Sequence, residues 1–275
     1  MMPAIGDSPP QPQGTMVFPP DAYTEGARFQ LEKRRLFAAA WLPVCAAGQI
    51  AEPGAFDSHA IGGWPVLAIR GADGIARGFR NVCRHQGMPV VEQPAGRCDS
   101  LRCRYHGWTY DLAGALVAAP PAVAPEDPAA PRHRLEALAL AEADGMIQLT
   151  ARADAPPAPR FEPGEARWCG AATTDIEANW KAVIETLLGD ASWRLVWPLA
   201  VVGRIGAGHV VRQVVPRSFL RTRLVDLAFG APADAPAIKA AAEAAQAARA
   251  AGTPPDATPA VADFHARLTE ACGLA

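Results

Sequence analysis

The chain has 275 residues, which allows one large domain or two of modest size. Hydrophobic residues make up 50% of it and charged residues 20%, the balance of an ordinary globular protein. The formal net charge is −2 and no long basic run is present, so the composition argues against nucleic-acid binding.

The first forty residues divide into an arm and a helix. Residues 1–20 are rich in proline, glutamine and glycine, and we expect them to form a flexible arm. Residues 21–40 are predicted to form an N-terminal helix that leads into the first domain. Phe29, Leu36 and Phe37 recur there at near-helical spacing.

The sequence favours a cytoplasmic protein. Its N-terminus lacks the basic start and apolar run of a signal peptide. No apolar run reaches the roughly 18 residues that a helix needs to cross a bilayer, so no membrane association is predicted. The 6 cysteines are spread over a long chain, which favours metal binding or buried packing over a disulfide framework.

Short strands separated by turns predict an all-β domain over residues 41–153. Residues 51–63 contain Pro-Gly and Gly-Gly pairs, which mark turns. Residues 118–132 are dense in proline and alanine and are interpreted as an extended covering loop. The predicted strands are 41–50, 64–70, 75–82, 101–110, 115–117, 135–140 and 145–149.

Residues 164–275 show mixed strand and helix patterns and predict a second, α+β domain. The proline-rich residues 154–163 mark the boundary. Thr174 and Glu177 fit a capping box at the start of a helix that ends at Gly189. The other predicted elements are strands at 195–200, 209–215 and 221–229, a strand pair with a tight turn at 201–208, and helices at 237–251 and 261–272.

Two short Cys/His motifs carry the strongest chemical signal. Cys83 and His85 form C-x-H, and after residues 86–102 Cys103 and His106 form C-x-x-H. A Rieske [2Fe–2S] centre binds one of its irons through two histidines in place of two cysteines. Two adjacent loops that each offer one thiolate and one imidazole can supply this ligand set. The pattern therefore predicts a Rieske-type [2Fe–2S] cluster held by these four residues.

Two alternatives to the cluster are open on the motif alone. Two cysteines and two histidines could bind zinc in a tetrahedral site. Zinc sites usually pair C-x-x-C with H-x-x-x-H, however, and do not place one cysteine and one histidine in each loop. The four residues could also be unrelated core residues.

The sequence around the ligands resembles a known family. The loops read NVCRHQGMPV (residues 81–90) and CRYHGWTYDLAG (residues 103–114). They closely resemble the cluster loops of Rieske non-haem iron oxygenases, and more narrowly the alpha (large) subunits of ring-hydroxylating oxygenases. The respiratory branch has an extra cysteine in each loop, and Met88 and Tyr105 stand at those places here. Cys98 lies elsewhere and is interpreted as a free thiol.

A weaker resemblance continues through the second half. Residues 179–181 (NWK) with Glu185 resemble the start of the family's catalytic domain. Residues 221–224 resemble one of its strands, and residues 263–265 its closing helix. The resemblance implies an α+β protein with an N-terminal all-β Rieske [2Fe–2S] domain. A shortened, helix-grip-like catalytic-type domain over residues 164–275 would follow it.

The resemblance also implies a second iron, but the matching positions lack its ligands. Family members hold a mononuclear iron with two histidines and one carboxylate, a set that leaves positions open for O₂ and substrate. Here the two histidine positions fall at Ser192 and Trp197, and the acid that bridges to a neighbouring subunit's cluster falls at Gly189. The carboxylate position falls near Ile238. A second alignment reads residues 196–198 as a strand from far downstream, so that the whole iron-bearing stretch is deleted.

Other side chains could in principle replace the missing ligands. The candidates are Asp190, Glu185, Asp226, His209 and His265. Glu185 is interpreted as structural, Asp190 as a turn residue, His209 as the start of a strand and His265 as an outer-face residue of the last helix. His59 and His133 are interpreted as surface residues. A working mononuclear Fe(II) site is therefore not expected, and no catalytic residue is assigned.

Three functions remain possible. The first is a Rieske oxidoreductase component that passes single electrons to a catalytic oxygenase partner. The resemblance implies trimers in which each cluster serves a neighbour's iron, so the partner could complete a homo- or hetero-trimer. A ferredoxin or a flavin reductase would donate the electrons, since nothing resembles a flavin or nicotinamide site. The second is a divergent but active mono- or dioxygenase with unusual ligands, and the third a non-enzymatic redox sensor.

The two histidine ligands are the predicted electron exit, because they should lie at the exposed tip of the cluster. Donors near Arg84, Gln86, Gly107 and Trp108 are expected to tune its potential through hydrogen bonds to sulfur.

Overall fold

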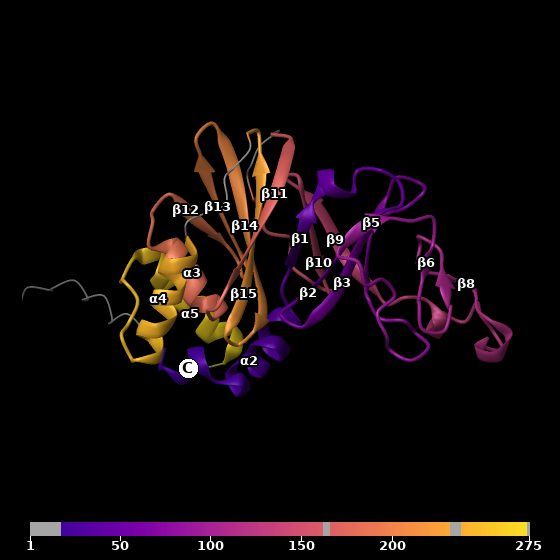
Figure 1. Cartoon of the computed structure of the whole chain (residues 1–275), viewed down its shortest axis with the longest axis horizontal. Coiled ribbons are helices and arrows are strands. Elements are labelled where there is room, and N and C mark those ends of the chain that lie inside the picture. Colours follow the sequence, from indigo (N-terminus) through magenta and orange to yellow (C-terminus); the bar gives the residue numbers. More distant parts are fainter. Residues whose placement is uncertain (1–17, 162–165, 232–237, 274–275) are drawn as a thin grey trace, which may run out of the picture.

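The computed structural model describes residues 18–161, 166–231 and 238–273. Two β domains lie side by side, and a layer of helices covers the outer face of the second (Figure 1). Among the described residues, no helix is long and apolar enough to cross a membrane.

The N-terminal half begins with a helical segment and continues as strands, as predicted. The segment consists of α1 (Asp21–Thr24), α2 (Gly26–Glu32) and a π-helical turn (Lys33–Phe37). The strands are β1 (Leu42–Ala46), β2 (Ala55–Ile61), β3 (Trp64–Arg70), β4 (Ala76–Arg80), β5 (Ala95–Arg97), β6 (Leu101–Arg102), β7 (Thr109–Tyr110), β8 (Leu116–Ala118), β9 (Ala137–Ala143) and β10 (Met146–Thr150). Short 3₁₀ turns occupy Ala47–Ile50, Pro121–Val123 and Pro131–His133.

These strands form two antiparallel sheets. The larger has the order β1-β10-β9-β4-β3-β2-β5, and the smaller has the order β6-β7-β8. Turns but no strand were predicted within residues 51–63, whereas β2 occupies most of them. Gly62 and Gly63, both with positive φ, form the two-residue turn of the β2–β3 hairpin. The predicted strand over 101–110 is also interrupted, because residues 103–108 form a cluster loop between β6 and β7.

The second domain is an antiparallel sheet of the order β11-β15-β14-β13-β12 with three helices. Its elements are β11 (Trp168–Ile176), α3 (Trp180–Leu188), β12 (Trp193–Val196), β13 (Ala200–Ile205), β14 (Gly208–Ser218), β15 (Arg221–Phe229), α4 (Ile238–Ala250) and α5 (Pro259–Cys272). The predicted capping box is wrong, since Thr174 lies inside β11. The N-cap of α3 is Asn179, whose side chain accepts a hydrogen bond from the Lys181 amide.

The five-stranded sheet has two different faces. Gln213 of β14 donates to the Pro43 carbonyl in β1, so one face meets the N-terminal domain. Thr222 of β15 donates to the Ala178 carbonyl at the start of α3, 2.8 Å away. Alternate residues of a strand point to opposite faces, and Gln213 and Thr222 lie on opposite faces of this sheet. The helices therefore cover the face that does not meet the N-terminal domain. The two cluster loops, one between β4 and β5 and the other between β6 and β7, lie in the part of the molecule opposite these helices (Figure 1).

The N-terminal helical segment packs against the second domain. Glu32 accepts hydrogen bonds from Trp180 Nε1 at 2.7 Å and from Lys181 Nζ at 2.6 Å, and all three side chains are buried. Phe37 meets the Trp180 ring edge-on, with 5.4 Å between the ring centroids. Phe37 also lies against the β2–β3 hairpin, where a Cβ on Gly62 would come within 2.2 Å of its ring. The segment thus joins the two domains.

Candidate iron–sulfur site

The two motifs form loops of the same shape. In the first, the Cys83 amide donates to the Met88 carbonyl at 2.7 Å, and the Gly87 amide donates to the Cys83 carbonyl at 2.9 Å. In the second, the Cys103 amide donates to the Trp108 carbonyl at 2.9 Å, and the Gly107 amide donates to the Cys103 carbonyl at 3.0 Å. Both glycines have positive φ, near 70–76°, which favours glycine over residues with a Cβ.

The loops bring the four predicted ligands together. Cys83 and Cys103 are only 2% and 1% exposed, and their thiols are close enough to act on each other electrostatically. His85 and His106 are half-buried, with 4.7 Å between their ring centroids. The arrangement therefore places both sulfurs inside and both imidazoles nearer to the surface.

The electrostatics of the site suit bound metal. Burial raises the pKa of the Cys103 thiol, and the neighbouring Cys83 raises it further. Amides from Tyr105 and His106 point at the sulfur and lower it. The thiolate is the form that binds iron. Burial disfavours this charged form, and the positive charge of bound iron would stabilise it. His85 Nδ1 is buried and has no hydrogen-bond partner among the described residues, as expected for a metal-binding atom. These residues fit a Rieske-type cluster.

Aromatic residues hold the site in place. The Trp108 ring stacks on His85, with centroids 5.1 Å apart and planes 15° from parallel. Its indole nitrogen donates to the Val123 carbonyl at 2.9 Å, which fixes the covering loop over the site. His133, predicted to be a surface residue, is half-buried and meets Trp108 edge-on at 5.6 Å. Its role followed from no sequence signal, because it lies far from both motifs along the chain.

Tyr110 is a second residue that the sequence did not single out. Its hydroxyl lies 3.2 Å from Cys83 Sγ and accepts a hydrogen bond from the Arg84 amide at 3.0 Å. Since the oxygen accepts from Arg84, its own hydrogen is free to point at the sulfur. The pKa of this phenol is raised, first by burial and then by Cys83, so the hydroxyl stays protonated and able to donate.

Replacing Tyr110 with phenylalanine is expected to lower the reduction potential of the cluster without removing it. A hydrogen bond to sulfur stabilises the reduced, more negative cluster. At a net 0.5–1.5 kcal/mol for one hydrogen bond, its loss corresponds to roughly 20–60 mV in a one-electron couple. An EPR-monitored redox titration measures the shift. An unchanged potential would show that the hydroxyl does not donate to Cys83.

Glu185, one of the candidate substitute ligands, is the centre of a buried network. Its carboxylate accepts from the Tyr23 hydroxyl at 2.5 Å and from Arg249 Nε at 2.8 Å, and lies 2.8 Å from His265 Nε2. The prediction that His265 lies on the outer face of the last helix is wrong, since it is only 1% exposed. The network joins α1, α3, α4 and α5 through one carboxylate, which fits a structural role for Glu185.

The remaining candidates are scattered. Asp190 is exposed and accepts from the Ser192 amide at 2.9 Å, the geometry of a turn residue. His209 is half-buried on β14, where Arg204 of β13 is its cross-strand partner. Among residues 18–161, 166–231 and 238–273, no group of three or more His, Cys, Asp or Glu side chains is arranged to hold a single metal ion. This finding does not count against the proposed cluster. A binuclear cluster takes only two protein ligands on each iron, so its four ligands need not surround a single ion.

Asp226 is buried in an unusual setting on the helix-covered face of the sheet. Arg212, its cross-strand partner, lies 3.3 Å away and stacks 4.0 Å over the Trp193 ring. Neither carboxylate oxygen of Asp226 accepts a hydrogen bond from the described part of the chain. Burial raises the pKa of Asp226 to about 6, against the lowering effect of Arg212. This carboxylate is therefore costly to ionise.

The free energy of unfolding is expected to fall as the pH rises from 3.8, the usual pKa of an aspartate, to about 6. In that window the folded chain holds the Asp226 proton more tightly than the unfolded chain, so raising the pH removes stability. The loss at neutral pH is roughly 3 kcal/mol, from about 1.36 kcal/mol per unit of pKa. Denaturant unfolding at a series of pH values measures it.

Asp226→Asn is expected to remove this slope, and Asp175→Asn serves as its control. Arg223 holds the pKa of the exposed Asp175 below its usual value, so its titration affects stability only at lower pH. A slope that survives in Asp226→Asn would assign it to another group.

Comparisons with known proteins agree with the site. Residues 40–138 match the model of the family described as "Rieske [2Fe-2S] domain". The chlorobenzene dioxygenase subunit alpha of Cupriavidus sp. (strain PS12) is 41% identical over 101 residues, which cover 37% of this chain and 22% of the relative. The glycine betaine monooxygenase oxygenase subunit of Chromohalobacter salexigens is 32% identical over 194 residues, 66% of this chain and 43% of the relative. The matched regions thus span less than half of either relative.

Solved structures share the fold over most of the chain. The apo form of the quaternary ammonium Rieske monooxygenase CntA superposes with a TM-score of 0.77 at 18% identity, covering 93% of this chain and 95% of that one. A naphthalene 1,2-dioxygenase with indole bound gives 0.66 at 18% identity, covering 94% and 80%. One structure of the CntA enzyme is described in terms of inter-subunit electron transfer. Residues 40–138 therefore form a Rieske [2Fe-2S] domain, and the chain shares the fold of Rieske oxygenases and is similar in sequence to their alpha and oxygenase subunits.

Proposed function

We propose that this protein is a Rieske [2Fe–2S] oxidoreductase component that passes single electrons to a catalytic partner and has lost its own mononuclear iron site. The observation that carries the proposal is that the side chains of the second domain that could bind a metal are already paired with other protein groups. Glu185 and His265 are bonded to each other inside the helical layer, and Asp226 is paired with Arg212. The positions aligned with iron ligands hold Ser192 and Trp197.

The cluster would be held by Cys83 and Cys103 on one iron and by His85 and His106 on the other, and it would accept and release one electron at a time. The chain's own residues prepare this site. Trp108 fixes the orientation of His85 by stacking. The covering loop and the buried cysteines keep water from the sulfurs.

The position of the cluster loops supports transfer to another chain. They lie at the opposite end of the molecule from the helices of the second domain (Figure 1). An electron that leaves through an imidazole therefore emerges far from this chain's own helical layer. Two relatives are named as subunits, and a related structure is described by inter-subunit electron transfer, which fits a partner in a homo- or hetero-trimer. A ferredoxin or a flavin reductase would supply the electrons.

A divergent but active oxygenase is the alternative, since the relatives are named as dioxygenase and monooxygenase subunits. Iron content per chain, measured on anaerobically purified protein, separates the two. About two irons and a rhombic Rieske signal in the dithionite-reduced form support electron transfer alone. About three irons, one of them outside the cluster, would overturn the loss of the mononuclear site.

A further inference from the structure

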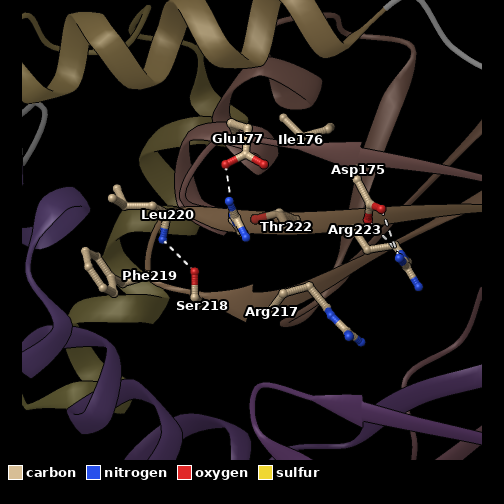
Figure 2. A pocket seen from close by; sticks show the side chains of 10 residues that line it. Asp175, Ile176, Glu177, Arg217, Ser218, Phe219, Leu220, Thr222 and Arg223 are labelled. Carbon is tan, nitrogen blue, oxygen red and sulfur yellow. Dashed lines mark hydrogen bonds and ion pairs between the residues drawn. The ribbon is translucent and has the colours of Figure 1, made fainter.

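A pocket of about 660 Å³ opens on the second domain (Figure 2). It lies between the end of β11 and the β14–β15 hairpin. Its size falls in the range of about 300–1,000 Å³ that is typical of small-molecule sites. The lining residues are Asp175, Ile176, Glu177 and the run from Arg217 to Arg223.

A β-bulge shapes the charged end of the pocket. The pairing of β14 with β15 shifts between Pro216 and Ser218, so Arg217 is the extra residue and has no cross-strand partner. A bulge redirects a side chain out of the regular alternation of a strand. Figure 2 shows Arg217 and Arg223 at the same end of the pocket, with their side chains extending in the same direction.

The arginines outnumber the carboxylates of the pocket. Arg223 is paired with Asp175 through two hydrogen bonds of 2.8 and 2.9 Å, and Arg221 with Glu177 at 3.0 Å. Arg217 forms no hydrogen bond or ion pair with the residues that the structure describes. It still acts on Asp175, whose pKa is lowered first by Arg223 and also by Arg217. One guanidinium with five donors is therefore available for an anion.

The opposite end of the pocket is apolar. Phe219 and Leu220 lie there, separated from Arg217 and Arg223 along the pocket (Figure 2). Leu220 is 39% exposed, one of few large hydrophobic side chains that are open to solvent among the described residues. A ligand with an apolar body and an anionic group at one end would satisfy both ends at once.

We propose that this pocket binds a small organic carboxylate, with its carboxylate on Arg217 and its apolar body against Phe219 and Leu220. This binding site would be additional to the proposed electron-transfer function and does not depend on it. A carboxylate matches the planar fork of a guanidinium, and charge-assisted pairs of this kind are the stronger hydrogen bonds.

Titration calorimetry of the purified full-length chain with benzoate tests the proposal, with benzamide as the uncharged isostere. We expect benzoate to bind about tenfold more tightly than benzamide, and Arg217→Gln to remove most of that difference. Arg167→Gln, a change of an exposed arginine outside the pocket, is the matched control and should leave the benzoate affinity unchanged. Leu220→Ser should lower the affinity for benzoate, which has an apolar ring, and leave any affinity for inorganic phosphate unchanged.

Equal affinities for benzoate and benzamide would overturn the proposal, as would the absence of saturable benzoate binding. Equal losses in Arg217→Gln and Arg167→Gln would show a general charge effect and would also overturn it. Iron content and the EPR signal of the same samples report separately on the electron-transfer site, so failure of one proposal is distinguishable from failure of the other.

Discussion

Replacing Cys103 with serine is expected to abolish the iron–sulfur cluster and to destabilise the N-terminal domain. Cys103 is buried, lies beside Cys83 and begins the second loop. A serine oxygen is a poor substitute for a thiolate on iron, and the free energy of metal binding contributes to folding. Visible absorption and EPR measure the cluster, and thermal unfolding measures the stability. Cys83→Ser should give the same result.

Cys98→Ser is the matched control for this change. Cys98 lies between the two loops in sequence and is a free, half-buried cysteine outside the ligand set. Its replacement should leave the cluster spectrum intact and change the free energy of unfolding by less than about 1 kcal/mol. The ligand assignment fails if Cys98→Ser loses the cluster or Cys103→Ser keeps it.

The histidines separate a Rieske centre from an all-cysteine one. In His85→Cys and His106→Cys, any cluster that forms should have a lower reduction potential, because Rieske centres owe their high potentials to imidazole ligation. A spectrum that survived the loss of both histidines would rule out the Rieske assignment.

The proposed cluster site could be recognised in the sequence because its candidate ligands are local. Each loop supplies a cysteine and a histidine within four residues, and Gly87 and Gly107 allow the tight turn that each loop needs. The strand pattern predicted the all-β character for the same reason, since hairpins such as β3–β4 are short-range structures. Strand β2 itself was missed because its glycine-rich ends resemble a run of turns.

The contacts that the sequence could not predict are long-range. Tyr110 reaches Cys83 across 27 positions, and His133 reaches Trp108 across a loop. His265 was placed on the wrong face of α5, because one histidine in an amphipathic pattern reads as polar and exposed. Its burial depends on Glu185, which is 80 positions earlier in the chain. Only the fold brings an acid to that point of the helical layer.

Replacing Glu185 with alanine is expected to destabilise the second domain by about 3–5 kcal/mol. The carboxylate is buried, and its removal leaves the Arg249 guanidinium, 9% exposed, without its counter-charge. The Tyr23 hydroxyl and His265 would also lose their partner, and each unsatisfied buried group adds its desolvation cost. Denaturant unfolding measures the loss.

Two further variants decide whether Glu185 is structural. Glu270→Ala, an exposed change on α5, should alter stability by less than about 0.5 kcal/mol. Glu185→Gln keeps the volume and one acceptor oxygen, so it should fold with a smaller loss than alanine and keep the same iron content as the unaltered chain. If Glu185 were instead an iron ligand, Glu185→Gln would lower the iron content by about one per chain while leaving the Rieske EPR signal in place. The same variant therefore separates a carboxylate that holds four helical segments together from one that holds a metal.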